Sequence, residues 1–179
     1  VALEKTGRIS ALAFDKTGTL TAGHPAITRW EDLRPENFRS IPLPALAGLL
    51  ANRSQHPVSR AVSAADKALR DPSPTSGASL LALISWRELR GQGIEAIAAG
   101  GDPGSPLRLG SVGWMRSLGI PLSGEAEACL QQASEAGHSA LLLAEGGVLL
   151  GILHIGDAVR PDSLEVVRRL QAQGTETWL

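Results

Sequence analysis

The sequence predicts a mixed architecture, in which an α/β unit is divided between the two ends of the chain and encloses an inserted antiparallel sheet with helices. Near the N-terminus, residues 8–14 form an almost continuous apolar run, which is typical of a strand covered on both faces. Near the C-terminus, a helical apolar pattern leads into a second strand-like segment. Between them, short apolar segments alternate with glycine-containing turns, as in antiparallel hairpins. We therefore expect one partial domain from residues 1–24 and 150–179, and an inserted domain from residues 25–149.

In the first half of the insertion, residues 26–30 are expected to form a short strand and residues 34–44 a loop or the entry to a helix. A helix is expected to begin at Pro57, with His56 at or near its N-cap. Its apolar stripe consists of Val58, Ala61, Val62, Ala65 and Leu69.

The second half of the insertion is expected to be mostly hairpins. After a loop at residues 71–77, strands are expected at residues 80–89 and 94–99, on either side of Gly91-Gln92-Gly93. A short strand at 107–109 and a helix at 123–136, ended by Gly137, come next. Residues 140–144 and 148–154 are expected to form a hairpin that turns at Gly146-Gly147. A helix is expected to be opened by Pro161 and stopped by Gly174, and a strand to start at Thr175. The side chains of this helix expected to point inward are Leu164, Val166, Val167 and Leu170.

Composition excludes several classes of protein. The formal net charge of −1 gives no single-signed field that would attract nucleic acid. Cys129 is the only cysteine, which excludes an internal disulfide and any CxxC metal site, and we expect it to be a small buried apolar residue. Trp30, Trp86 and Trp114 are expected to pack in the core or at its edge, and His24, His138 and His154 are too scattered to propose as metal ligands. No apolar run approaches the roughly 20 residues that a membrane helix needs, so the chain itself is expected to be soluble.

The strongest chemical signal is the heptapeptide Asp15-Lys16-Thr17-Gly18-Thr19-Leu20-Thr21, which follows the first apolar strand directly. The carboxyl end of a strand is where open α/β sheets bind their ligands. A carboxylate at that place can attack a phosphoryl group if cations and backbone N–H groups neutralise the transferring oxygens, and Lys16 and Thr19 are the local candidates. The alternative is that Asp15 only caps a turn, as aspartates before glycine-containing loops often do.

Together with Phe14, this heptapeptide resembles the phosphorylation signature of the P-type ATPases. The resemblance implies a haloacid-dehalogenase-like, Rossmann-type phosphorylation domain with an inserted nucleotide-binding domain. It also implies that Asp15 accepts the γ-phosphate of ATP and forms an aspartyl phosphate. Mg²⁺ is then held by the Asp15 carboxylate and the main-chain carbonyl of Thr17.

Soluble phosphatases of the haloacid dehalogenase class resemble the same motif, but they carry a second aspartate where this chain has Thr17. An acid there activates water and discharges the phosphoenzyme, whereas threonine is no base at neutral pH. Thr17 therefore favours an intermediate that lasts, as a pump requires. A phosphatase whose inserted region is a substrate cap remains an alternative, and a non-catalytic nucleotide-binding module is another.

Downstream, Ser54-Gln55-His56-Pro57 resembles the Ser-Glu-His-Pro element of the heavy-metal-transporting branch. In that branch the histidine is associated with holding the adenine, and the dipole at a helix N-terminus favours the neutral ring that this requires. A surface cap is the alternative role of His56. Gly91 and Gly93, followed by Ile94, resemble the family's glycine pair, although a plain hairpin turn has the same pattern. Gly110-Ser111 falls where the family commonly has Gly-Asn.

Three positions depart from the family pattern, and the departures at Ser111 and Ala51 remove possible polar contacts to the base. Gln55 replaces a glutamate, Ser111 replaces an asparagine, and Ala51 lies where many members have a glutamate five residues before the histidine. Either Gln55 or Ser111 compensates for them, or the chain binds nucleotide more weakly than its relatives.

Asp157-Ala158-Val159-Arg160 resembles the element at the hinge where the family's chain returns to the phosphorylation domain, so Asp157 and Arg160 are assigned to the hinge. An N-cap with a surface ion pair is the alternative there.

As a whole, the resemblance implies a cytoplasmic ATP-binding and phosphorylation fragment of a membrane-embedded pump for a heavy metal, with copper favoured as the cargo. The family's Thr-Gly-Asp stretch and later Mg²⁺-binding aspartates would follow Leu179. We therefore expect the chain alone to bind ATP but to turn over slowly or not at all.

Overall fold

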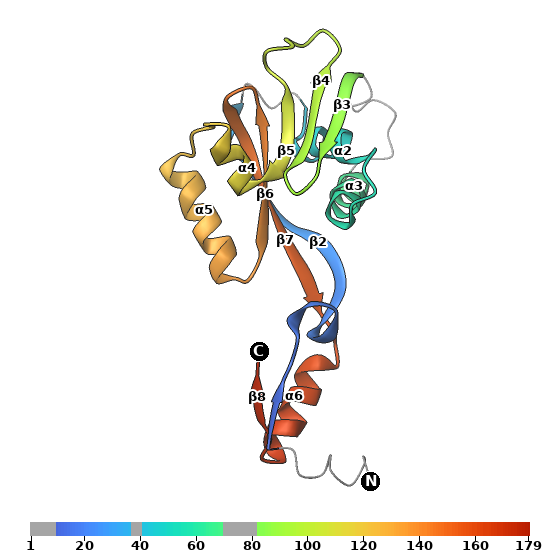
Figure 1. Ribbon diagram of the computed structural model, residues 1–179, viewed down its shortest axis with the longest axis vertical. Coiled ribbons are helices and arrows are strands. Elements are labelled where there is room, and N and C mark those ends of the chain that lie inside the picture. The colour runs from blue at the N-terminus through green and yellow to red at the C-terminus, as the bar shows by residue number, and fades with distance from the viewer. Residues whose placement is uncertain (1–9, 37–40, 70–81) are drawn as a thin grey trace. The chain divides into compact units, whose positions relative to one another are not determined.

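The computed structural model describes residues 10–36, 41–69 and 82–179, except the side chains of Lys16, Thr17 and Ala158. The chain divides into two units (Figure 1). The first unit comprises the N-terminal residues up to His24 together with Asp157–Leu179, and the second comprises Pro25–Gly156. Within the described residues, none of the helices has both the length and the hydropathy that crossing a bilayer requires.

The first unit contains two strands, β1 (Ala11–Ala13) and β8 (Glu176–Trp178), and the helix α6 (Ser163–Ala172). β1 pairs with β8 in parallel, with Leu12 opposite Thr177. A single π-helical turn, η1 (Lys16–Leu20), separates β1 from β2 (Thr21–Asp32). The expected strand at each end of the chain is therefore present, and the two strands are neighbours.

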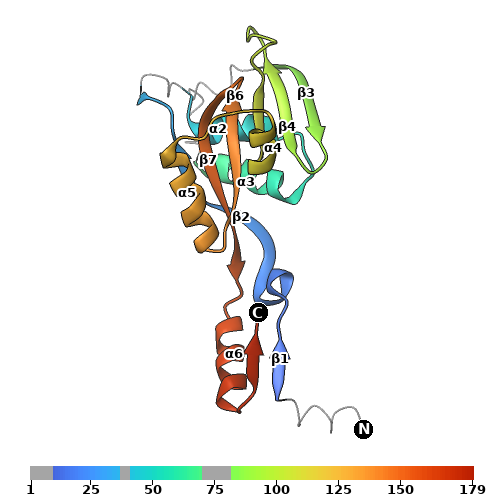
Figure 2. The same cartoon turned by 60° about the vertical axis from the view of Figure 1, so that its left-hand side comes forward.

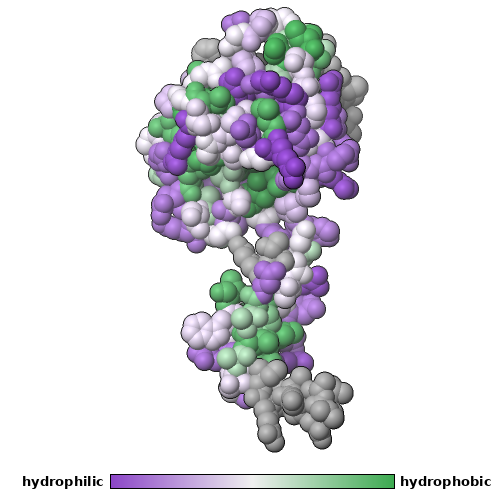
Figure 3. All heavy atoms as spheres, viewed as in Figure 1, coloured by the Kyte–Doolittle hydropathy of each residue, from purple (hydrophilic) through white to green (hydrophobic). Residues whose placement is uncertain are grey.

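Two expectations for the first unit were wrong in detail. Ala11 and Ala13 are exposed, so β1 is not covered on both faces by the described residues, and Arg8 and Ile9 lie outside them. α6 begins two residues after Pro161, and its Leu164 and Val166 side chains are 56% and 46% exposed instead of inward. Both have one physical cause: a sheet of two strands offers too little surface to bury a whole helix stripe. Figure 3 shows apolar side chains on the visible face of this unit.

The second unit is built on a six-stranded sheet in the order β2-β7-β6-β5-β4-β3 (Figure 2). Adjacent strands from β3 to β7 are antiparallel. Besides β2, its strands are β3 (Leu83–Leu89), β4 (Gly93–Ala98), β5 (Leu107–Ser111), β6 (Ser139–Glu145) and β7 (Val148–Val159).

Helices cover both faces of this sheet. Side chains of a β-strand alternate between the two faces, so each strand supplies residues to both layers of helices. On one face, α2 (Leu43–Ala51) and α3 (Pro57–Leu69) pack with Leu143 and Leu153 in the first core cluster. On the other, α4 (Val112–Ser117) and α5 (Gly124–Glu135) pack with Leu142 and Ile152 in a second cluster. Neighbouring residues of β6 and β7 thus belong to opposite cores.

Most of the predicted elements of the insertion are confirmed. The helix starts at Pro57, the two hairpins turn at Gly91–Gly93 and Gly146–Gly147, and Ser123 caps α5 by accepting the Ala126 N–H at 3.2 Å. The tryptophans also pack as expected: Trp114 is 7% exposed, and the Trp86 indole donates to the Leu50 carbonyl at 2.8 Å. Cys129 is only half-buried, and burial raises the pKa of its thiol.

Other expectations differed. Leu69, the last residue of the expected α3 stripe, is 61% exposed because it lies at the helix end. β2 extends over 12 residues instead of 5, since it pairs with the long strand β7. Residues 71–77, expected as a loop, and residues 80–81, expected at a strand start, lie outside the described residues.

The chain returns from the second unit to the first at Asp157, whereas the sequence placed the return at residue 150. Residues 150–155 remain in the sheet because β7 pairs with β6 as far as Ile155, opposite Ser139.

Candidate functional site

Asp15 lies two residues after the end of β1, at the carboxyl end of a parallel strand pair. The pairing continues to Phe14, whose N–H donates to the Trp178 carbonyl at 2.9 Å. The next residue, Asp15, is exposed and is not part of the ladder. Its carboxylate is thus held at a strand end by a fixed backbone and is open to solvent, which is the position that a nucleophile in an α/β sheet requires.

The loop after Asp15 is tied down by Asp157. One carboxylate oxygen, Oδ2, accepts from the Thr21 hydroxyl and from the Gly23 N–H at 3.2 Å, and the other, Oδ1, accepts the His24 N–H at 3.1 Å. The Thr21 hydroxyl in turn accepts the Gly18 N–H at 3.2 Å, and Gly18 has the positive φ of 80° that only glycine adopts readily. Asp157, far away in sequence, therefore fixes the end of the loop that follows Asp15.

Arg160 and Ser163 complete this attachment from the start of α6. The Arg160 guanidinium donates to the carbonyls of Thr21 at 3.2 Å and Gly18 at 3.4 Å, and the Ser163 hydroxyl donates to the Leu20 carbonyl at 2.8 Å. The sequence singled out Asp157 and Arg160 but missed Ser163. No local pattern marks Ser163, because its partner is 143 residues away.

The remaining predicted residues of this loop are placed by their backbone. Lys16, Thr17 and Thr19 lie in η1, and the Thr19 side chain is exposed. The side chains of Lys16 and Thr17 lie outside the described part of the chain. For a magnesium ion, the donors present are hard oxygens, namely an exposed carboxylate and main-chain carbonyls, which is the donor set that Mg²⁺ prefers. Asp15 and Thr17 therefore fit the ion by their chemistry.

In the second unit, His56 is the N-cap of α3. Its carbonyl accepts the Arg60 N–H at 3.0 Å, and its own Nδ1 accepts the Val58 N–H at 3.3 Å. Because Nδ1 accepts, the neutral ring carries its proton on Nε2. The side chains of Gln55, His56 and Pro57 are exposed. A histidine that caps a helix can still expose its ring to solvent. The two roles predicted for His56, capping α3 and holding an adenine, therefore do not exclude one another.

The predicted glycines lie opposite each other in the sheet. Gly93 on β4 pairs with Gly110 on β5, and Ile94 pairs with Leu109. A Cβ atom at Gly93 would lie 2.3 Å from the Leu109 carbonyl oxygen, and one at Gly110 would lie 2.4 Å from the Trp114 ring. Close packing against these atoms is therefore a structural reason for glycine at positions 93 and 110. Gly91 differs: its φ is 74° and the space around it is open.

Ser111 has a structural partner of its own. Its hydroxyl accepts the Trp114 N–H at 3.2 Å as the N-cap of α4, and its N–H donates to the Gln92 carbonyl at 2.8 Å. Ser111 is therefore fixed beside the turn of residues 91–93.

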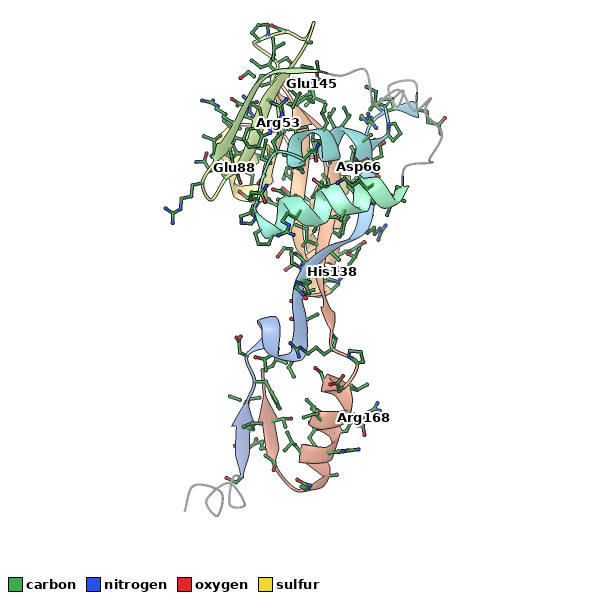
Figure 4. The ribbon with its side chains drawn as sticks, turned by 90° about the vertical axis from the view of Figure 1, so that its right-hand side faces the viewer. Arg53, Asp66, Glu88, His138, Glu145 and Arg168 are labelled. Carbon is green, nitrogen blue, oxygen red and sulfur yellow. The ribbon has the colours of Figure 1, made fainter. Side chains whose placement is uncertain are left out.

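A contact that the sequence did not reveal links the His56 loop to the sheet. The Ser54 hydroxyl donates to Oε1 of Glu88 on β3 at 2.9 Å and accepts the His56 N–H at 3.1 Å. Glu88 is opposite Ile94 in the ladder. The predicted nucleotide residues of the second unit thus form a connected set. Figure 4 labels Glu88 on the sheet and Arg53 on the connection between α2 and α3.

Two cavities lie elsewhere in this unit. One of 270 Å³ is lined by Arg116, Glu127 and His138, and one of 240 Å³ by Arg29, His138 and His154, among others. Burial lowers the pKa of the His154 imidazole; Arg29 and His138 lower it further, and the Glu31 carboxylate, 3.9 Å from Nε2, opposes them. Neither cavity is lined by a residue assigned to the nucleotide.

Comparison with known proteins gives a consistent family assignment. A model of the haloacid dehalogenase-like hydrolases matches residues 9–179. The chain is 28% identical over 176 residues to the copper-transporting ATPase HMA4 of Oryza sativa subsp. japonica, covering 97% of this chain and 17% of that protein. It is 31% identical over 176 residues to the manganese-exporting P-type ATPase of Mycobacterium bovis, covering 96% of this chain and 22% of that protein.

A crystal structure of a zinc-transporting PIB-type ATPase in the E2.Pi state resembles the fold, with a TM-score of 0.70 and 28% identity. That match covers 98% of this chain and 26% of the other. The chain thus spans about a fifth of the length of these curated relatives.

Proposed function

The chain belongs to the haloacid dehalogenase-like hydrolases, with heavy-metal P-type ATPases as its relatives, and from this premise we propose that ATP phosphorylates Asp15. The observation that carries the proposal is the position of Asp15, exposed at the end of β1 and followed by a loop that Asp157 and Arg160 hold.

In the proposed reaction, an Asp15 carboxylate oxygen attacks the γ-phosphorus of ATP. A bond forms between that oxygen and phosphorus, the bond from phosphorus to the β,γ-bridging oxygen breaks, and ADP leaves with the bond electrons. Asp15 and the main-chain carbonyl of Thr17 would hold Mg²⁺, which would supply positive charge to the phosphoryl oxygens. Lys16 and Thr19 contribute an ammonium and a hydroxyl donor. Thr17 leaves the loop without a second acid, so the aspartyl phosphate persists until water hydrolyses it.

The proposed nucleotide site lies in the second unit. His56 contacts the adenine through its outward-facing ring, with Gln55 and Pro57 beside it. Gly91, Gly93 and Ile94 form a backbone surface against which the nucleotide lies, and Gly110 and Ser111 border it. The support for this assignment is the contact of Ser54 with Glu88, the pairing of Glu88 with Ile94, and the pairing of the adjacent Gly93 with Gly110.

We propose further that the chain serves a membrane-embedded pump, on its cytoplasmic face, and that copper is the cargo. Copper is named for the rice relative, whereas manganese and zinc are named for others. A transport assay with the whole pump therefore needs all three ions, and transport of manganese or zinc without copper contradicts the copper assignment.

Nucleotide binding tests the second unit. Calorimetric titration with ATP is expected to show binding to the wild-type chain and at least about tenfold weaker binding to His56→Ala, the loss of one good polar contact. His24→Ala is the matched control, because His24 is also an exposed histidine and contributes only its backbone N–H to the Asp157 cluster. Absence of nucleotide binding by the wild type contradicts the proposal.

Phosphoenzyme formation tests the first unit. In the pump that contains this chain, labelling from γ-³²P-ATP is expected to be acid-stable and hydroxylamine-sensitive, and to disappear in Asp15→Asn. Asp162→Asn, an exposed aspartate without a capping bond in the structure, should still be labelled. If small phosphate esters are hydrolysed instead and no nucleotide binds, the soluble phosphatase is the better assignment.

A further inference from the structure

Glu88 connects the strand β3 to the loop that carries His56. Glu88 lies two residues after Trp86, so the two side chains share one face of β3. The Trp86 indole reaches the end of α2 at Leu50, and the Glu88 carboxylate reaches Ser54, four residues later. Its opposite neighbour in the sheet is Ile94, a proposed nucleotide residue.

The hydrogen bond between Glu88 and Ser54 involves a buried hydroxyl that has two partners. Ser54 is only 4% exposed, and its hydroxyl uses its single proton for Oε1 of Glu88 and a lone pair for the His56 N–H. A buried hydroxyl in this position fixes the backbone of His56 and thereby the direction of its ring. Oε2 of Glu88 accepts no hydrogen bond from the described residues, and the Glu88 side chain is exposed.

Glu88 places a carboxylate beside the loop of His56, where the neighbouring sequence positions have none. This chain has alanine at position 51 and glutamine at position 55, so neither position supplies a carboxylate near the histidine. Glu88 does supply a carboxylate to this segment, through its hydrogen bond with Ser54. A carboxylate is an acceptor only, and the 6-amino group of adenine is a donor.

We propose that Glu88 is the carboxylate of the purine site: Oε1 positions Ser54 and His56, and Oε2 accepts the 6-amino group of an adenine nucleotide. This inference rests on the proposed function and adds to it a residue and a preference for 6-aminopurines over 6-oxopurines. Such a preference is expected because a 6-oxo group would place an acceptor against an acceptor.

The test compares binding of ATP and ITP, which differ at the purine 6-position, to three forms of the whole chain. The wild type is expected to bind ATP about tenfold more tightly than ITP, as expected for one hydrogen bond to a charged group. In Glu88→Gln the preference is expected to shrink to about threefold or less, because the amide still accepts from Ser54 but can now also donate to the 6-oxo group. Glu145→Gln is the control of equal charge change, since Glu145 is an exposed acid on β6, and it should keep the wild-type ratio.

A second variant separates positioning from recognition. Ser54→Ala removes the link to His56 but leaves the Glu88 carboxylate, so ATP and ITP should both bind more weakly with little change in their ratio. An unchanged ATP/ITP ratio in Glu88→Gln, in a chain whose wild type binds ATP and loses it in His56→Ala, overturns the role of Glu88 alone. A wild type that binds neither nucleotide overturns the proposed function as well.

Discussion

At the scale of single residues, His154 is a buried histidine without a hydrogen-bond partner for Nε2 among the described residues. Burial lowers its pKa from 6.5, so the folded state binds a proton less readily than the unfolded chain does. The stability that this neutral side chain contributes is therefore present above pH 6.5 and is lost as the pH falls toward the lower, folded-state pKa.

We expect the free energy of unfolding, measured by urea titration, to decrease between pH 7.5 and 5.5 with a slope of at most about 1.4 kcal/mol per pH unit from this residue. His154→Gln should reduce the slope. His24→Gln, which changes an exposed histidine, should not. Equal slopes in the wild type and His154→Gln would show that other groups cause the acid sensitivity.

Gly110 packs closely against its neighbours, and the effect of this packing on stability can be measured separately from nucleotide binding. A Cβ there would lie 2.4 Å from the Trp114 ring and 2.5 Å from the Gln92 carbonyl oxygen. Gly110→Ala should therefore cost about 1–3 kcal/mol of stability, as overpacked sites do. Gly113→Ala is the control, because that Cβ would meet open space in a helix, and it should be neutral or slightly stabilising. Thermal unfolding of both variants measures the difference, and an unaffected Gly110→Ala would mean that the ring moves aside freely.

The sequence was sufficient to place Asp15 at the end of a strand, because an apolar run directly precedes it. It was not sufficient to predict the contact between Ser54 and Glu88. The bond from Ser54 to Glu88 joins residues 34 apart, and no local pattern near Glu88 differs from that of an ordinary exposed strand residue. Ser163 was missed for the same reason.

At the scale of elements, α4 begins where one of the proposed nucleotide residues lies. The Ser111 hydroxyl caps this helix, so Ser111→Ala should lower the stability by about 1 kcal/mol whatever else the residue does. Ser123→Ala removes the equivalent cap from α5, at a place without proposed ligand contacts. If Ser111 also contacts the nucleotide, calorimetry should show weaker ATP binding for Ser111→Ala than for Ser123→Ala at equal loss of stability. Equal ATP affinities would leave Ser111 with the capping role alone.

The sequence indicated only a loop or the entry to a helix before α2, and it did not indicate α4; both have a physical explanation. In α2, buried residues occur on every side, including Leu43, Ala45, Leu46 and Leu50, so no polar face marks the 3.6-residue period. α4 has only six residues and follows β5 without a turn. By contrast, α3 was predictable from its capping residue and its amphipathic pattern, and α5 from the serine at its start and Gly137 just after its end.

At the scale of the whole molecule, the insertion leaves and re-enters the first unit through adjacent strands. β2 and β7 are neighbours in the sheet, the Leu33 N–H donates to the Leu150 carbonyl at 3.0 Å, and the Thr28 hydroxyl donates to the His154 carbonyl at 3.4 Å. Both core clusters lie within this unit. An inserted domain with neighbouring ends and its own cores has what it needs to fold independently.

We therefore predict that a polypeptide of residues 25–156 folds cooperatively and binds ATP with the affinity of the whole chain, within about threefold, because every proposed nucleotide residue lies inside it. Circular dichroism during urea unfolding measures the first property and calorimetry the second. Asp157→Asn in the whole chain provides the complementary variant: it weakens the attachment of the loop after Asp15, so phosphorylation should suffer while ATP affinity stays unchanged. If residues 25–156 unfold without a cooperative transition, the two units depend on each other for stability, and the loss of ATP affinity in such a polypeptide would place part of the nucleotide site in the first unit.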